Sequence, residues 1–174
     1  MTTDPRDNLW NYSFETYYNS YFEELLSDKL IKQWARIDIG VKILVALTAT
    51  GSAVTGWTLW QKPEFKEIWA AISGIAAVAG IISTTVQFGN FIKDHTKANK
   101  EFAVIRNELE NFRYGLNQDP QFDVKVKDAE FMKLKKKYED CCTNNSNTDW
   151  TVTDRLRNKV QLELNRIIQN QINA

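Results

Sequence analysis

The chain is poor in the residues that catalysis, metal binding and disulfide formation need. Its 174 residues include one histidine, His95, and two cysteines, Cys141 and Cys142, which are adjacent. A tetrahedral zinc site needs Cys or His ligands at suitable spacing, and no such spacing exists. The sequence also lacks a Gly-rich phosphate loop, a GxSxG motif and an HExxH motif. We therefore predict a non-enzymatic protein that needs no cofactor or metal and keeps both thiols reduced in a cytosolic segment.

Net charge is absent as well, because 22 basic and 22 acidic side chains balance. This balance excludes a general electrostatic attraction to nucleic acids. The charges are unevenly distributed, however. Residues 43–61 and 68–92 carry none, whereas 93–137 is densely charged, and the mean hydropathy of the whole chain is −0.43. Such a chain is typical of a protein that meets two solvents, water and lipid.

Two uncharged stretches are long enough to cross a bilayer as helices. The 25 residues of 68–92 would extend roughly 37 Å, against about 30 Å for the hydrocarbon core. The earlier stretch, 43–61, is shorter and is interrupted by hydroxyl side chains. The charged connection QKPEFKE, 61–67, suits a tight hairpin, and tryptophans on both sides of it resemble an interfacial belt. We predict spans at about 41–60 and 68–92.

The basic residues around this hairpin predict its orientation. They are more numerous outside the hairpin than in its loop, so the positive-inside rule places both termini in the cytoplasm. No cleaved leader is expected, because the N-terminus is acidic and aromatic. The predicted organisation is a cytosolic helix in 1–40, a transmembrane hairpin in 41–92 and a cytosolic helical region in 93–174. The basic residues are Lys29, Lys32, Arg36 and Lys42 before the first span, Lys62 and Lys66 in the loop, and Lys93, Lys97, Lys100 and Arg106 after the second.

Hydrophobic periodicity predicts the remaining elements. Residues 13–36 form an apolar stripe that leads into the first span, and this helix either packs on other cytosolic helices or lies on lipid headgroups. A helix from about 93 to Gly115 carries Phe102, Ile105, Leu109 and Phe112 on one face. Further helices are expected over 123–141 and after a cap at Thr151 or Thr153. No run alternates like a strand, so the fold class is all-α.

A stripe of small and polar residues runs along one side of each predicted span. Lipid should contact apolar side chains, so these stripes face either neighbouring helices or a water-filled pore. Both explanations stay open, although Gln87 favours the pore, because packing does not require a large amide at that depth. One hairpin cannot enclose a pore, so this explanation requires a homo-oligomer. The candidate pore-lining residues are Thr48, Ser52 and Thr55 in the first span and Ser73, Gly80, Thr84 and Gln87 in the second.

Three further features lie near the ends of the predicted spans or in the cytosolic region after them. Phe88 and Phe91 are either hydrophobic gates or ordinary interfacial aromatics. Asp38 and Lys42, four residues apart, form either a helical ion pair or a ring of charge at a pore mouth. A basic cluster interleaved with aromatic residues is either a solvated face attracted to anionic lipid or a site for a nucleotide or oligonucleotide. The candidate anion-binding residues are Arg106, Arg113, Lys133, Lys135, Lys136 and Lys137.

The order of these parts resembles a known family. An N-terminal helix ending WARIDIG precedes a hydroxyl-rich span, a short hairpin and a small-residue span; KDHTKANKEFAVIRNELENF and two C-terminal helices follow. Over about residues 20–170 this layout is similar to the SLATT domains, two-transmembrane effector domains of bacterial conflict systems. The resemblance implies a pore-forming effector of the bacterial inner membrane, paired with enzymes that make or sense nucleotide signals. Its activation would permeabilise the membrane, arrest growth and stop phage spread. The alternative is a membrane-anchored interaction or scaffold protein that does not conduct.

Overall fold

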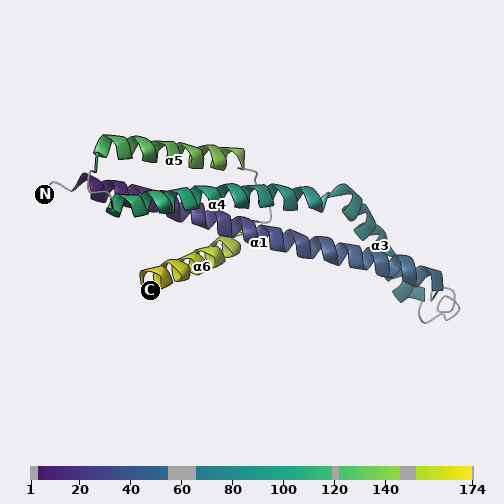
Figure 1. Cartoon of the computed structure of the whole chain (residues 1–174). Coiled ribbons are helices and arrows are strands. Elements are labelled where there is room, and N and C mark those ends of the chain that lie inside the picture. The colour runs from purple at the N-terminus through teal and green to yellow at the C-terminus, as the bar shows by residue number, and fades with distance from the viewer. Residues whose placement is uncertain (1–3, 55–65, 119–121, 146–151, 174) are drawn as a thin grey trace. The chain divides into compact units, whose positions relative to one another are not determined.

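The computed structural model describes residues 4–54, 66–118, 122–145 and 152–173. These residues form helices and no strand, so the predicted all-α fold class is confirmed. Two compact units are present: a terminal unit of residues 1–30 with 94–174, and a middle unit of residues 31–93. Figure 1 labels the helices, which are α1 Pro5–Val54, α3 Lys66–Thr85, α4 Phe88–Gln118, α5 Val124–Asn144 and α6 Asp154–Ile172.

The terminal unit has a core to which α1, α4, α5 and α6 all contribute. The predicted stripe on α4 is buried along its whole length, and Leu109 and Leu116 are fully inaccessible. On α6, Val160 and Leu164 are fully inaccessible as well. Burying large apolar side chains of this kind contributes about 1.5–3 kcal/mol each. The terminal unit therefore has large apolar side chains in its core, the arrangement that is typical of helical domains in water.

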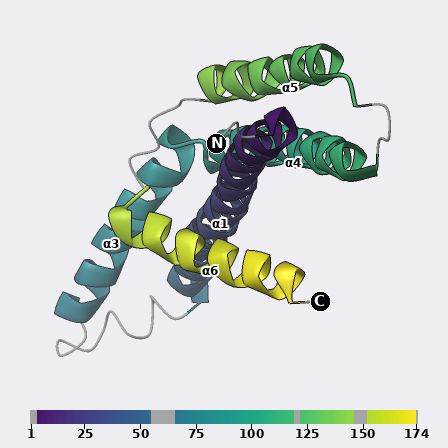
Figure 2. The same ribbon diagram turned by 90° about the vertical axis from the view of Figure 1, so that its left-hand side faces the viewer.

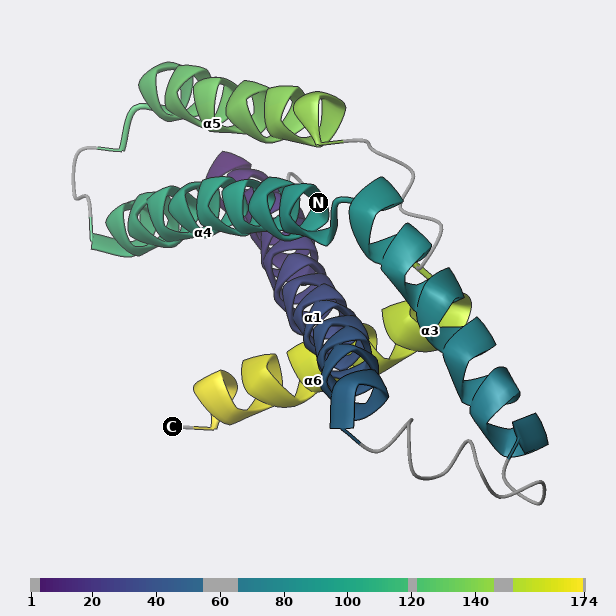
Figure 3. The ribbon, with the colours of Figure 1, turned by 90° about the vertical axis from the view of Figure 1, so that its right-hand side faces the viewer.

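Contacts between the helices define their directions within the terminal unit. Phe112 of α4 stacks on Phe131 of α5, and Glu101 near the other end of α4 contacts Cys141. Residue numbers thus fall on one helix as they rise on the other, so α4 and α5 are antiparallel neighbours (Figure 3). Glu24 accepts a hydrogen bond from Asn99, whereas Arg113 lies over rings near the start of α1, so α1 and α4 are antiparallel too. The ribbon shows α5 and α6 on opposite sides of this pair (Figure 2).

Side-chain caps explain where α5 and α6 begin. The carboxylate of Asp123 accepts a hydrogen bond from the backbone N–H of Lys125 at 2.9 Å. The hydroxyl of Thr153 accepts one from the N–H of Leu156 at 3.2 Å, as one of the two predicted caps requires. Each bond satisfies a backbone donor that the first helical turn leaves without a partner.

In the middle unit, α1 runs without interruption to Val54. The predicted N-terminal helix and the start of the first predicted span are therefore one helix, and the rest of that span lies outside the described residues. Asp38 and Lys42 form the predicted i, i+4 ion pair on it, with 2.7 Å between Oδ2 and Nζ. A charge ring at a pore mouth stays a prediction.

The second predicted span is not one helix. α3 ends at Thr85 and α4 begins at Phe88, so the expectation of an unbroken helix over 68–92 is wrong. Within the described part of the chain, no single helix is both long and apolar enough to cross a membrane. One bent pair, Gly74–Thr85 with Phe88–Leu116, reaches that length and composition, and its two members meet at 46°.

Candidate functional site

The buried position on the described part of α3 is taken by a small residue, and large apolar residues of the same helix are exposed. Ala79 is 6% exposed, and Gly80 beside it is half-buried. Ile75, Val78 and Ile81 are 58%, 57% and 65% exposed. At 100° per residue, Ile81 lies about 160° and Val78 about 100° from Ala79, whereas Ile75 lies one turn before Ala79, at the margin of the buried side. A helix of a water-soluble domain has the reverse arrangement.

The polar stripe of the second span is only partly preserved in the structure. Gly80 and Thr84 share one side of α3, and the Thr84 hydroxyl donates to the carbonyl oxygens of Gly80 and Ile81 at 3.2 and 3.0 Å. Gln87 lies beyond the end of α3, so the helical phase that aligned it with Thr84 no longer applies. Of the other pore-lining candidates, Thr48 and Ser52 lie on α1 and Ser73 on α3, without described side chains, and Thr55 lies outside the described residues.

Gln87 forms the joint between α3 and α4. Its φ is +41°, the only positive value for a non-glycine residue among those described. Its carbonyl oxygen accepts from the N–H of Asn90 at 2.8 Å, and its Oε1 accepts from the Asn90 amide at 2.6 Å. The N–H of Val86 still donates to Ile82. A left-handed residue therefore ends one helix and starts the next.

The two gate candidates pack against α1. Phe88 is buried, and its ring centroid lies 5.9 Å from that of Trp34, which is 1% exposed. The ring of Phe91 stacks on Trp34 with 4.6 Å between centroids and 17° between planes. Offset stacking of this kind contributes about 0.5–1.5 kcal/mol beyond area burial. Both phenylalanines thus anchor the first turn of α4 to α1.

The two arginines proposed for an anion site are turned toward α1. Arg106 Nε donates to Glu24 Oε2 at 2.6 Å in a pair that is about four-fifths buried. The Arg113 guanidinium lies over the rings of Trp10 and Phe14, at 4.1 and 4.6 Å from their centroids. Burial lowers the pKa of Arg113. These cations belong to the interior of the terminal unit.

The four lysine candidates on α5 point in different directions. Lys133 and Lys136 are exposed on the outer side of the helix. Lys137 Nζ lies 2.7 Å from both carboxylate oxygens of Glu108 on α4. Lys135 lies on the edge that faces α1. The structure therefore does not bring the six cations together, and only Lys135 lines a groove toward α1.

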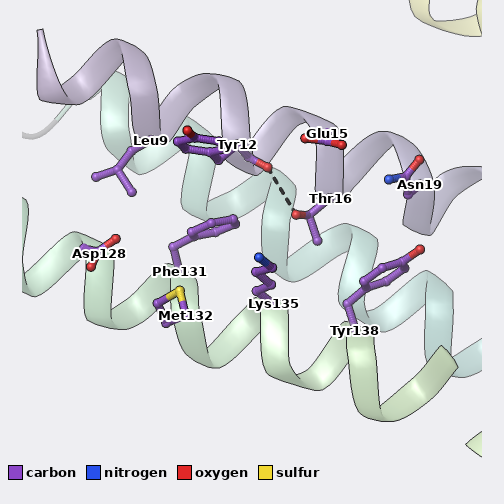
Figure 4. A pocket seen from close by; sticks show the side chains of 10 residues that line it. All are labelled: Leu9, Tyr12, Glu15, Thr16, Asn19, Asp128, Phe131, Met132, Lys135 and Tyr138. Carbon is purple, nitrogen blue, oxygen red and sulfur yellow. Dashed lines mark hydrogen bonds between the residues drawn. The ribbon is translucent and has the colours of Figure 1, made fainter. Parts of the chain in front are cut away.

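That groove lies between the parallel helices α1 and α5 and has a volume of about 360 Å³. Figure 4 shows Lys135 reaching from α5 toward α1, between the rings of Phe131 and Tyr138. Carboxylates are present too, so the groove offers one cation, two anions and aromatic rings. Its lining residues are Leu9, Tyr12, Glu15, Thr16, Asn19, Asp128, Phe131, Met132, Lys135 and Tyr138.

A second group of polar residues surrounds Glu23 of α1, which interacts electrostatically with Arg157 of α6 and Cys142 of α5. Burial raises the pKa of Glu23, and the positive charge of Arg157 partly opposes this shift. Both cysteines are free. Burial also raises the pKa of Cys141, to about 12, with a further contribution from the nearby Glu101 carboxylate. The Cys141 thiol therefore stays protonated at neutral pH and is a poor nucleophile.

Sequence reasoning missed Trp34 and Gln87 as structural centres of the middle unit. Trp34 lies in the WARIDIG stretch, where it could be identified only as an aromatic near the membrane. Its partners are more than 50 positions away in sequence, so no local pattern marks them. Gln87 is a residue with no preference for positive φ, so composition gives no signal for the joint either.

No family model, curated protein or solved structure matches the chain.

Proposed function

We propose that the protein is an oligomeric effector of the bacterial inner membrane whose hairpins surround an ion-conducting pore, with both termini in the cytoplasm. The observation that carries this proposal is the inverted packing of α3. Large apolar side chains in water cost about 25 cal/mol per Å² of exposed apolar surface. In lipid this cost disappears, and helices associate instead through small residues such as Ala79 and Gly80. The resemblance to SLATT domains supports a role in antiviral defence.

A pore additionally requires several copies of the chain, because one hairpin is too thin to enclose water. The edge of α3 that carries Gly80 and Thr84 is the candidate lining in such a homo-oligomer. A non-conducting membrane-anchored scaffold is the second candidate. It is favoured by the Thr84 hydroxyl, whose single hydrogen is donated to the backbone of its own helix, so that the side chain cannot donate to water or an anion and offers a pore only its oxygen.

The first test moves one positive charge onto α3. Ile81→Lys places an ammonium near the middle of the uncharged segment, which costs about 2.5–3.5 kcal/mol at the centre of a bilayer. We expect its partition into lipid vesicles to fall roughly 100-fold and ion flux to disappear. Leu162→Lys on α6 is the matched control, because Leu162 is 68% exposed and Ile81 65%. Equal partition of both variants would contradict membrane insertion by α3.

Flux separates the two candidates once insertion is established. Purified protein in vesicles should conduct, and Thr84→Val should change the rate or ion selectivity while insertion stays the same. Insertion without flux, for the ligand-free protein and with every nucleotide tested, would favour the scaffold. A monomer in detergent and in vesicles would count against the pore as well.

We further propose that a nucleotide or oligonucleotide made by a partner enzyme binds in the α1–α5 groove and gates the pore. Small-molecule pockets occupy about 300–1,000 Å³, so this groove is large enough for one base. Lys135 can pair with a phosphate, and the nearby rings can stack on a base. Asp128 and Glu15 favour a ligand with an amino group over a polyphosphate.

The groove and a non-specific basic surface predict different mutational results. Lys135→Glu should weaken nucleotide binding at least about tenfold, because it reverses the one cation in the groove. Lys136→Glu makes the same charge change on the outer side of α5 and should have little effect. Equal effects of the two variants in a titration would assign binding to general surface charge.

A further inference from the structure

We infer that the joint at Gln87 is a two-state bend, in which α3 and α4 are separate helices in the bent state and one continuous helix in the bilayer-spanning state. This inference rests on the proposed membrane function and concerns its regulation. The bent state is the one in the structure. The straight state would restore an uncharged helix over 68–92, with a length of roughly 37 Å.

The backbone of Gln87 identifies the joint as the element that changes. A non-glycine residue in the left-handed region is strained and persists only where its surroundings hold it there. Here the surroundings are the hydrogen bonds from Asn90 and the stack of Phe91 on Trp34, which fixes the first turn of α4. Only Val86 and Gln87 lie between the two helices, and a change of Gln87 from φ +41° to a helical φ is the main change that a continuous helix requires.

The solvent around the joint determines which state is favoured. A break in a helix exposes backbone N–H and C=O groups, which water can hydrogen-bond. Hydrocarbon cannot, and each unsatisfied group there costs several kcal/mol. Transfer of the joint from water into lipid therefore favours the straight state, and contact with water, including the water of a pore, favours the bent one.

Position 87 allows the equilibrium to be shifted in both directions. Gln87→Gly removes the left-handed strain and weakens a continuous helix, so it favours the bent state. Gln87→Val makes positive φ much less accessible, so it favours the straight state. Gly89→Ala is the matched control, because Gly89 has no positive φ and an added Cβ meets nothing within 4 Å.

The experiment measures a distance across the joint in the full chain. Spin labels at the exposed positions Ile75 and Asn107, in a background with Cys141→Ala and Cys142→Ala, report it by pulsed electron paramagnetic resonance in lipid vesicles. Straightening a 46° bend between arms of these lengths lengthens the separation by about 4 Å. A control pair at Lys93 and Asn107 lies within α4 and should not change.

We expect the long distance to dominate in the wild type, in Gln87→Val and in Gly89→Ala. In Gln87→Gly the ratio of long to short distances should fall at least about tenfold. The same distance in wild type, Gln87→Gly and Gln87→Val would overturn the inference. Ion flux in the same vesicles reports separately on the pore: flux without any change in distance removes the two-state bend alone, and a distance change without flux removes the pore alone.

Discussion

Helices α3 and α6 have nearly the same length but opposite rules of packing. On α6 the large residues Val160 and Leu164 are inside and fully inaccessible. On α3 the inner position belongs to Ala79, and the large residues Ile75 and Ile81 are outside. Both helices have an inner and an outer face, so periodicity alone does not separate them. The size of the residues on each face separates the two helices, and the proposed function attributes this difference to the solvent around each helix.

The surroundings of charge differ between the two units in the same way. In the terminal unit, interior cations have partners of their own: Arg106 pairs with Glu24, and the Arg113 guanidinium lies over aromatic rings although its Nε has no hydrogen-bond partner. In the middle unit, the only charged residues between Lys66 and Lys93 are at the two ends and at Glu67. The terminal unit can be stable in water on its own contacts. The outer face of α3 exposes Ile75, Val78 and Ile81, and under the proposed function lipid covers them.

The largest expected effect tests the terminal unit's half of this comparison. Leu164→Ala removes a fully buried side chain and should lower the free energy of unfolding by about 2–5 kcal/mol. Leu162→Ala, on the exposed side of the same helix, should change it by about 0.5 kcal/mol or less. Chemical unfolding of the full-length protein, followed by circular dichroism, measures both. Similar losses in the two variants would mean that the outer face of α6 is covered as well.

The sequence predicted the terminal unit better than the middle unit, for a physical reason. The stripe from Phe102 to Phe112 and the cap at Thr153 are local patterns, and local patterns specify helices directly. α5 extends to Asn144 and α4 to Gln118, slightly past the predicted ends. Gly115 does not stop its helix, because glycine ends a helix only where the chain needs a left-handed residue.

The candidate site depended on contacts between distant parts of the chain, which local patterns do not contain. Arg113 belongs to a basic region by composition, yet its guanidinium lies over Trp10, which is 103 positions earlier. Gln87 was placed on a polar stripe by assuming that the helix continued. The Thr84 hydroxyl donates to the backbone one turn earlier, a bond that bends helices, and the left-handed Gln87 then ends α3.

A smaller effect tests the other half of the comparison, the requirement for small residues on the inner face of α3. Ala79→Leu adds three carbon atoms at a buried position and should lower stability by about 1–3 kcal/mol through overpacking. Ala77→Leu makes the same change on the exposed side of α3 and should be neutral in detergent and favourable in lipid, because a large apolar side chain on that face gains contact with hydrocarbon. Thermal unfolding of the full-length protein in detergent and in vesicles distinguishes the two positions. If Ala77→Leu were as destabilising as Ala79→Leu in both detergent and vesicles, the outer face of α3 would be packed against protein. Its large exposed residues would then mark an interface between copies of the chain and not a surface for lipid.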